Sequence, residues 1–337
     1  MIRRTAPAAP APVRVGAPAT RPRDEAPAAI ICADIHLSAR TPVARVDDYT
    51  AAQEAKLTWL QRLQRELDCP VIDGGDMFDH WKAPPWLSAL AYRRMPADLF
   101  TVPGNHDLPE HALTRYPHSA LHLLGATRDD VTVMNVTGTH PLYMVGNYLR
   151  VWAYPNGVFD PKALAEIPKA RGYRDVLVLH EFVWPGLKPP WHGAPGYMAQ
   201  ALLRVAAAAG YDLVVCGDNH KAFVESYEDT LLVNPGSMMR ATADQADYRP
   251  RCYLYYAKSH QLVPEYYPVA PAVITDEHLT RVQERDARVA AYIEHMNTQW
   301  AVGLSFRANL EAFLQANPTP RLVKELIWQH MDRTPAS

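Results

Sequence analysis

Five short motifs carry aspartate, histidine and asparagine side chains of the kind that bind divalent metal ions. Each motif directly follows a run of apolar residues, and three of them place a glycine just before the polar residue. Carboxylate and amide oxygens are hard ligands and imidazole is intermediate, so this mixture favours Mn²⁺, Fe²⁺ or Zn²⁺ over Ca²⁺, with Mg²⁺ a less natural choice. The motifs are Ala33-Asp34-Ile35-His36, Gly74-Gly75-Asp76-Met77-Phe78-Asp79, Gly104-Asn105-His106-Asp107, His180-Glu181 and Gly217-Asp218-Asn219-His220.

Two divalent ions held by such a set could hydrolyse a phosphoester. Metals about 3.5–4 Å apart clamp the attacking and leaving oxygens of an in-line displacement at phosphorus. They also lower the pKa of a bridging water, which would supply the attacking hydroxide without a Ser or Cys nucleophile. Each motif alone has a structural alternative, since a single Asp-x-His is a weak signal and the aspartates of the second motif could cap a helix. The ordered set of five favours the metal centre.

The apolar runs before the motifs have the length and the bounding turn residues of buried strands. Between the first two, residues 46–67 repeat apolar side chains at helical spacing. Alternating strands and helices predict an α/β layered fold, with mixed sheets because residues 131–151 and 223–267 resemble strands joined by turns. Ligands of open α/β sheets bind outside the carboxyl ends of the strands, so the motifs should converge there. The predicted strands are residues 28–33, 69–72, 99–102, 176–179 and 213–216.

Composition excludes several classes of protein. The chain has 337 residues, a formal net charge of −2 and 48% hydrophobic residues, which is ample for a core and argues against disorder or a grossly basic nucleic-acid coat. Its four cysteines lack the spacing of a disulfide framework or a structural zinc site. No apolar stretch is long enough to span a membrane, and the N-terminus lacks a secretory signal, so we expect a cytoplasmic protein.

Three regions are predicted along the chain. Residues 1–28 are rich in Ala, Pro and Arg and should form a disordered tail. Residues 29–270 should form the domain that carries the five motifs. Residues 271–337 should form a helical extension, with helices at residues 276–297, 305–315 and 319–331.

Together the five motifs resemble those of the calcineurin-like metallophosphoesterase superfamily, over about residues 30–260. The resemblance implies a four-layer α/β/β/α sandwich with a dinuclear metal centre at the strand ends. It also implies that Asp76 bridges the two metals, and that His106 is the general acid, oriented by Asp107. The first metal would further be bound by Asp34, His36 and His220, and the second by Asn105, His180 and Asp218.

One motif departs from the family pattern. The family usually has Gly-His-x-His at the last motif, whereas this chain has Gly-Asp-Asn-His, so that Asp218 replaces an imidazole with a carboxylate. A carboxylate can still ligate, but it adds negative charge and hardness. We expect a shift of metal preference away from Zn²⁺ toward Mn²⁺ or Mg²⁺, or else a weakened second site.

Within the superfamily, the chain is most similar to SbcD-type DNA repair nucleases and their phage-type relatives. That resemblance implies a DNA exo- or endonuclease, a possible homodimer, and C-terminal helices that dock on an SbcC-like SMC-type ATPase. Its grounds are Leu37, Arg45 and Asp47 after the first motif, the Pro-rich residues 82–85, residues 119–121, and the turn at residues 234–237.

Several residues outside the motifs could contact substrate. The segment after His180 is stiffened by prolines and could form a lid that stacks bases and meets phosphate, through Trp184, Lys188, Trp191 and His192. Its alternative is a rigid loop whose tryptophans cover the core. Trp81, Lys82 and Trp86 could form the opposite wall, and Arg240 could contact a phosphate, although solvated arginines are commoner.

Two other functions stay open at this point. A small-molecule phosphodiesterase or phosphomonoesterase would use the lid as a specificity cap. A weakly active subunit would bind DNA or an SbcC-like ATPase and need that partner for activity.

Overall fold

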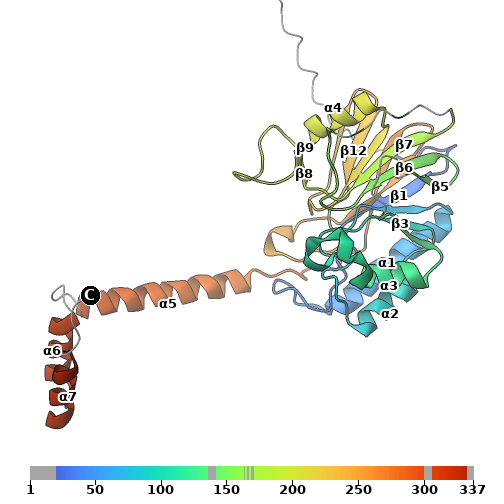
Figure 1. Cartoon of the computed structure of the whole chain (residues 1–337). Helices are drawn as coiled ribbons and strands as arrows, with labels where there is room; N and C mark the ends of the chain where they lie inside the picture. The colour runs from blue at the N-terminus through green and yellow to red at the C-terminus, as the bar shows by residue number, and fades with distance from the viewer. Residues whose placement is uncertain are drawn as a thin grey trace, which may run out of the picture. The chain divides into compact units, whose positions relative to one another are not determined.

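Two six-stranded sheets stack face to face, with helices on both outer faces (Figure 1). The computed structural model describes residues 20–135, 142–162, 164, 167, 171–299 and 306–331. The chain divides into two compact units, residues 1–275 and 276–337. The first unit is a four-layer α/β/β/α sandwich, as the resemblance implies, which confirms the fold class.

The first sheet has the order β14-β13-β1-β2-β3-β4. Strands β1 to β4 run parallel, and β13 and β14 add an antiparallel edge. Its outer face packs against α1, α2 and α3. The bounds are β1 (Ala29–Cys32), β2 (Val71–Asp73), β3 (Leu99–Thr101), β4 (Val131–Val133), β13 (Arg251–Tyr256), β14 (Gln261–Tyr266), α1 (Tyr49–Leu67), α2 (Pro85–Arg94) and α3 (Ala120–Thr127).

The second sheet has the order β11-β12-β10-β7-β6-β5, with four parallel strands between two antiparallel edges. Helix α4 covers its outer face, and a buried layer of aliphatic side chains fills the space between the sheets. The bounds are β5 (Leu142–Val145), β6 (Leu149–Tyr154), β7 (Arg174–Leu179), β10 (Leu213–Cys216), β11 (Phe223–Tyr227), β12 (Thr230–Asn234) and α4 (Ala199–Ala209).

All five predicted strands are present, as β1, β2, β3, β7 and β10, and a polar motif follows the carboxyl end of each. The predicted first helix starts later than expected, at Tyr49. Asp48 caps it, since its carboxylate accepts the N–H of Ala51 at 2.9 Å. The residues before the cap pair elsewhere, because the N–H of Val46 donates to the carbonyl of Val273. The four cysteines are buried and unpaired.

Part of the predicted disordered tail is bonded to the β13–β14 hairpin. The Nε of Arg21 donates to Glu265 at 2.8 Å. The Glu25 carboxylate accepts the backbone N–H groups of Lys258 and Ser259 at 2.7 and 3.0 Å. Within residues 20–28 of the predicted tail, charged side chains therefore bond to the hairpin. Residues 1–19 lie outside the described residues.

The second unit contains α5 (Glu277–Gln299), α6 (Phe306–Ala316) and α7 (Arg321–Met331), each within two residues of its predicted bounds. Helices α6 and α7 contact each other, since the Lys324 ammonium donates to the carbonyl of Leu314 at 2.6 Å. The Arg307 guanidinium also lies over the Trp328 ring. Among the described helices of the whole chain, none has the length and apolarity needed to cross a bilayer.

Candidate metal centre

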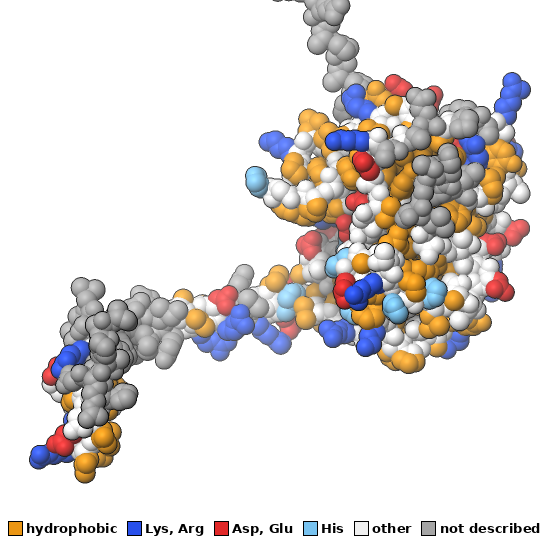
Figure 2. All heavy atoms as spheres, in the orientation of Figure 1, with side chains coloured by type: hydrophobic (Ala, Val, Ile, Leu, Met, Phe, Trp, Pro, Cys, Tyr) orange, Lys and Arg blue, Asp and Glu red, His pale blue; other side chains and the backbone are white. Residues whose placement is uncertain are grey.

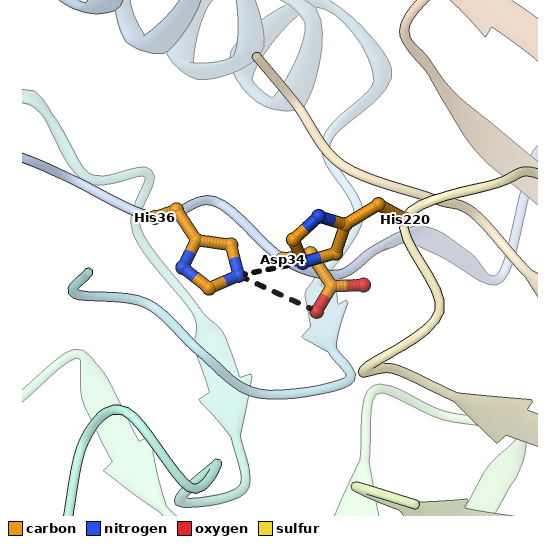
Figure 3. A group of neighbouring side chains, drawn as sticks. All are labelled: Asp34, His36 and His220. Carbon is orange, nitrogen blue, oxygen red and sulfur yellow. Dashed lines mark hydrogen bonds and ion pairs between the residues drawn. The ribbon is translucent and has the colours of Figure 1, made fainter. Parts of the chain in front are cut away.

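The first, second and last motifs meet at the strand ends of the two sheets. Figure 3 shows the rings of His36 and His220 directed at each other beside Asp34. Their Nε2 atoms are 3.0 Å apart, and Nε2 of His36 is 3.8 Å from Oδ1 of Asp34. His36 and Asp34 come from the loop after β1, whereas His220 follows β10 in the other sheet. A single ion could therefore be bound by ligands from both sheets.

A second cluster surrounds Asp76. Its Oδ2 is 3.5 Å from Nε2 of His36 and 3.3 Å from Nε2 of His180, so this carboxylate lies between the two groups. The Asn105 side chain joins the same cluster, with Oδ1 3.0 Å from Nε2 of His180. The other ring nitrogen of His180 lies 2.7 Å from the carbonyl of Gly74. That carbonyl accepts a hydrogen bond from Nδ1–H, and the Nε2 of His180 faces the cluster.

His106 faces these side chains from the third motif. Its ring is 4.9 Å from the His36 ring, and its backbone N–H donates to Oδ1 of Asp76 at 2.9 Å. Nδ1 of His106 lies 2.7 Å from the carbonyl of Asp79, so Nδ1 carries the proton of that bond. His106, His36 and Asp76 together form one of three groups of described residues whose ligand atoms lie within 4.8 Å of one another. The other groups are Asp34, His36 and His220, and Asp34, Asp76 and His180.

The backbone of these motifs is held in a conformation that side-chain-bearing residues rarely adopt. Asp34, His36, Asp76 and Asp218 have φ values of 51°, 47°, 56° and 70°. Non-glycine residues in this left-handed region are uncommon and gather at functional sites, where the surrounding structure fixes them. Gly104 allows the third motif to approach, because a side chain there would overlap the Asp76 carboxylate.

The donor set fits bound cations. Oδ2 of Asp34 is buried and has no hydrogen-bond partner among the described residues, which is costly unless a cation binds it. Burial raises the pKa of Asp34 to about 6 and lowers the pKa of His36 to about 3, since both charged forms lose water. Burial would also raise the pKa of Asp76, but attraction to His180, His36 and His106 together outweighs it and lowers that pKa. A neutral His36 and an ionised Asp76 are the forms that bind metals.

Asp218 contributes differently from the other predicted ligands. Its backbone N–H donates to Oδ1 of Asp34 at 2.9 Å, the oxygen that also lies 3.8 Å from Nε2 of His36, while Oδ2 is left without a partner among the described residues. Its carboxylate belongs to none of the three groups of described residues. That carboxylate is still near enough to His180 to help raise its pKa.

Two other predicted site residues make backbone contacts instead. The Asp107 carboxylate accepts N–H groups from Met77, Phe78 and Gly104 at 3.0–3.2 Å, which ties the second motif to the third. The carbonyl of Asp79, rather than Asp107, orients the His106 ring. Arg240 is only 7% exposed and donates to the carbonyls of Ala246 and Ala270, so its guanidinium supports loops and is not presented to a substrate phosphate.

The predicted lid is a tethered loop. Strands β8 (Val183–Trp184) and β9 (Tyr197–Met198) pair at its base, and Nδ2 of Asn219 donates to the carbonyl of Val183 at 2.7 Å. The base of the loop is thereby bonded to the last metal motif. Beyond it, Lys188 and His192 are exposed, Trp191 is 53% exposed, and Trp184 is half-buried beside Phe182. Figure 2 shows one face of the molecule, on which charged and imidazole side chains of the first unit reach the surface among apolar ones.

Sequence reasoning gave no ligand or catalytic role to two residues beside the site, Asp79 and His111, although the nearness of His111 to the third motif indicated that it could line the cleft. Asp79 contributes both its carbonyl, to His106, and its Oδ1, which lies 3.7 Å from Nδ1 of His36. Its place in the second motif was the available signal. Nδ1 of His111 lies 3.0 Å from the carbonyl of Asn105, and both Glu110 and His111 have φ of 54°. No sequence pattern indicates that two successive left-handed residues turn His111 back onto the third motif.

The family model described as "Calcineurin-like phosphoesterase superfamily domain" matches residues 28–254, which is more than half of the chain and spans all five motifs. The chain belongs to the calcineurin-like phosphoesterase superfamily. Members are metal-dependent phosphoesterases with a dinuclear divalent centre, and the clusters described above supply candidate ligands for both ions.

Comparison with other proteins does not assign the chain to a subfamily. None of the curated proteins matches the chain. Among solved structures, it is similar to an archaeal phosphodiesterase, with 12% identity, a TM-score of 0.39, and coverage of 71% of this chain and 98% of that one. A protein from Thermus thermophilus has 10% identity, a TM-score of 0.44, and coverage of 71% and 97%. A putative 5′-nucleotidase from Staphylococcus aureus has 15% identity, a TM-score of 0.41, and coverage of 74% and 54%.

Proposed function

We propose that this superfamily member is a two-metal phosphodiesterase that cleaves DNA, as an SbcD-type nuclease does. The observation that carries the proposal is the approach of His36, Asp76 and His106 to one another at the junction of the two sheets. Asp76 lies between two ligand groups, and His106 stands beside them with one ring nitrogen already bonded. This arrangement suits displacement at phosphorus with a proton donor on the leaving side.

The residues divide the chemical work between them. When bound, two divalent cations would stabilise the negative charge on the phosphoryl oxygens and lower the pKa of a water molecule. Asp34, His36, His220, Asn105 and His180 would hold the cations, and Asp76 would contact both. His106 keeps Nδ1–H on the Asp79 carbonyl, so its Nε2 is the atom that would give a proton to the leaving oxygen.

A nucleic-acid substrate is favoured by the loop of residues 185–196. Its exposed side chains combine an indole, an ammonium and an imidazole, which suit base stacking and phosphate contact. The loop follows shortly after the ligand His180, and its base is bonded to Asn219. A small-molecule esterase would need these side chains packed over a closed pocket, whereas Trp191 is 53% exposed.

We further propose Mn²⁺ as the physiological metal, because the Asp218 carboxylate places negative charge near His180, a proposed ligand. The test is a comparison of Mn²⁺, Mg²⁺ and Zn²⁺ affinity between the wild type and Asp218→His. The substitution should move preference toward Zn²⁺. An unchanged order of affinities would disprove this role for Asp218.

A partner protein is also proposed for the helical unit. Apolar side chains on α6 and α7 are exposed, with Phe313 at 56%, Leu322 at 73% and Leu326 at 60%. Such a face suits an amphipathic helical partner, and the SbcD resemblance suggests an SbcC-like ATPase in a DNA repair complex, built on a homodimer. Leu322→Glu with Leu326→Glu should abolish co-purification with a co-expressed ATPase of that type, and should leave the intrinsic nuclease activity unchanged.

The deciding experiment is cleavage of end-labelled linear DNA, single- and double-stranded, by purified protein with Mn²⁺. Asp76→Asn is the matched control, since it keeps the side-chain shape and removes the charge between the two clusters. Loss of cleavage in the variant supports the nuclease. If DNA stays intact while two metals are bound, hydrolysis of bis(p-nitrophenyl) phosphate or p-nitrophenyl phosphate would indicate a small phosphoester substrate. Activity appearing only with an added ATPase would indicate a dependent subunit.

A further inference from the structure

Two aromatic rings are stacked at the edge of the metal centre, on the segment that follows the second motif. The ring centroids of His80 and Trp81 are 5.3 Å apart, and the ring planes differ by 28°. Side chains of successive residues usually diverge, so a stacked neighbouring pair requires a bend in the backbone. Residues 79–82 form such a bend between the second motif and α2.

Backbone hydrogen bonds fix this pair in place. The N–H of Lys82 donates to Nδ1 of His80 at 3.0 Å, which sets the orientation of the imidazole and leaves its Nε2 protonated. The carbonyl of Trp81 accepts the N–H of Ala120 at 2.7 Å, at the start of α3. The pair is therefore ordered before any ligand arrives, which lowers the entropy lost on binding.

The same segment is joined to the proposed proton donor. The carbonyl that accepts Nδ1–H of His106 belongs to the peptide linking Asp79 to His80. His106 would protonate the leaving oxygen from Nε2, on the ring edge away from the Asp79 carbonyl, so the departing group would lie beside the imidazole that residue 79 holds in place. His80 and Lys82 are exposed there, and Trp81 is partly exposed.

We propose that His80 and Trp81 form a stacking subsite for the base of the leaving nucleoside, with the Lys82 ammonium meeting the next phosphate. This inference rests on the proposed function. It specifies that the base on the leaving side of the scissile bond is recognised. A flat π surface beside a cation binds any nucleobase without sequence preference. The subsite is separate from the loop of residues 185–196, which follows the fourth motif.

The test uses the dinucleotide dTpdT and two analogues, each lacking one of the two bases. The nucleoside released without phosphate identifies the leaving side, and the analogue lacking that base is the matched substrate. Trp81→Ala should raise KM for dTpdT by about 5–100-fold, as expected for loss of one stacked base, with little change in kcat. On the matched analogue, the variant and the wild type should have the same KM.

Three controls keep the outcome interpretable. Trp81→Phe retains a ring and should retain most of the affinity for dTpdT. Tyr148→Ala removes an exposed aromatic residue that directly precedes β6. It should leave KM unchanged for both dTpdT and the matched analogue. Thermal unfolding of each variant identifies loss of folding. Equal losses on dTpdT and on its base-free analogue, or no loss on either, would overturn the subsite.

Failure of the subsite can be told apart from failure of the proposed function. Binding of dTpdT and its analogues is measured by calorimetry in Asp76→Asn protein, where turnover is blocked. Weaker binding of the analogue lacking the leaving-side base, abolished by adding Trp81→Ala, supports the subsite. If the wild type leaves dTpdT uncleaved, the analogue that binds more weakly identifies which of the two bases the subsite contacts. Equal binding of dTpdT and both analogues still refutes the subsite.

Discussion

The metal centre and the loops beside it are built in opposite ways. At the metal centre, Asp34, Asp76 and His180 are almost fully buried and contact partners from both sheets. In the flanking segments, residues 80–82 and 185–196, most side chains are exposed, and the backbone is held by a few hydrogen bonds. We call these two segments the rim.

The difference indicates that the buried centre carries out the reaction, whereas the rim determines which substrates bind. The buried ligands depend on the whole sandwich, since β1, β2, β3, β7 and β10 each deliver one motif. The rim depends on a few local contacts, so its side chains can change without disturbing the ligands. Substitutions at the centre should therefore abolish turnover, whereas substitutions in the rim should change how tightly and how selectively substrate binds.

The largest effect is expected from Asp34→Asn. Oδ2 of Asp34 is buried without a partner among the described residues, so a cation is the natural occupant, and the variant should lose one bound metal. Activity should fall roughly 10³-fold, the upper range for removal of one preorganised electrostatic group. Metal content by mass spectrometry and DNA cleavage rates provide the measurement.

Asp107→Asn is the informative counterpart to Asp34→Asn. Both residues are buried aspartates of the motifs, but the Asp107 carboxylate already accepts three backbone N–H groups. In the variant, the side-chain NH₂ would face a backbone N–H group that now donates to a carboxylate oxygen. The loss should lower the free energy of unfolding by about 1–3 kcal/mol, while metal content stays normal. If Asp107→Asn lost metal and Asp34→Asn lost stability, the assigned roles would be reversed.

Metal binding should strengthen as pH rises. Burial raises the pKa of Asp34 to about 6. Burial lowers the pKa of His180, but its pairing with Asp76 more than compensates and raises it. Both groups hold protons near pH 5, and a cation must displace them, so affinity for Mn²⁺ should rise about tenfold or more between pH 5 and pH 7. Titration calorimetry across this range tests the sign, and a flat profile would contradict it.

Much of this architecture could be predicted from sequence because the signals are local. Each motif directly follows an apolar run, so the five strands and the convergence of Asp34, Asp76 and His180 follow from the general geometry of α/β sheets. The helix start was misjudged by three residues, since Asp48 was not recognised as a cap and the pairing of Val46 with Val273 spans most of the chain.

Long-range backbone contacts account for most of the misjudged residues of the site. Arg240 follows a turn typical of the family, yet it is directed into carbonyls of residues 246 and 270. Asp107 looks like a partner for its neighbour His106, yet its oxygens accept N–H groups from residues 77, 78 and 104. Such pairings depend on which loops lie next to each other in the folded protein, and residue type alone does not predict that.

An intermediate effect is expected at His111, which contacts the backbone of the third motif. Its imidazole bonds to the carbonyl of Asn105, a proposed ligand, from a left-handed backbone. His111→Ala should lower metal affinity or kcat about tenfold, as removal of a group that orients a ligand often does. His111→Asn should recover most of that loss, because asparagine tolerates this backbone and its amide can donate to the carbonyl. Equal losses in both variants would argue against positioning.

The smallest effect is expected in the rim, at Trp191. Its indole is half-exposed and lies 5.2 Å from the Phe182 ring, so Trp191→Ala removes a stacking surface without opening a core cavity. KM for single-stranded DNA should rise about fivefold, with kcat and metal content unchanged, as expected for about 1 kcal/mol of stacking. Lys188→Gln, in the same loop, should instead reduce the dependence of binding on salt, because it removes a phosphate contact. A fall in kcat for Trp191→Ala would indicate that the loop takes part in the catalytic step. The proposed division between a buried centre and a selective rim would then be wrong.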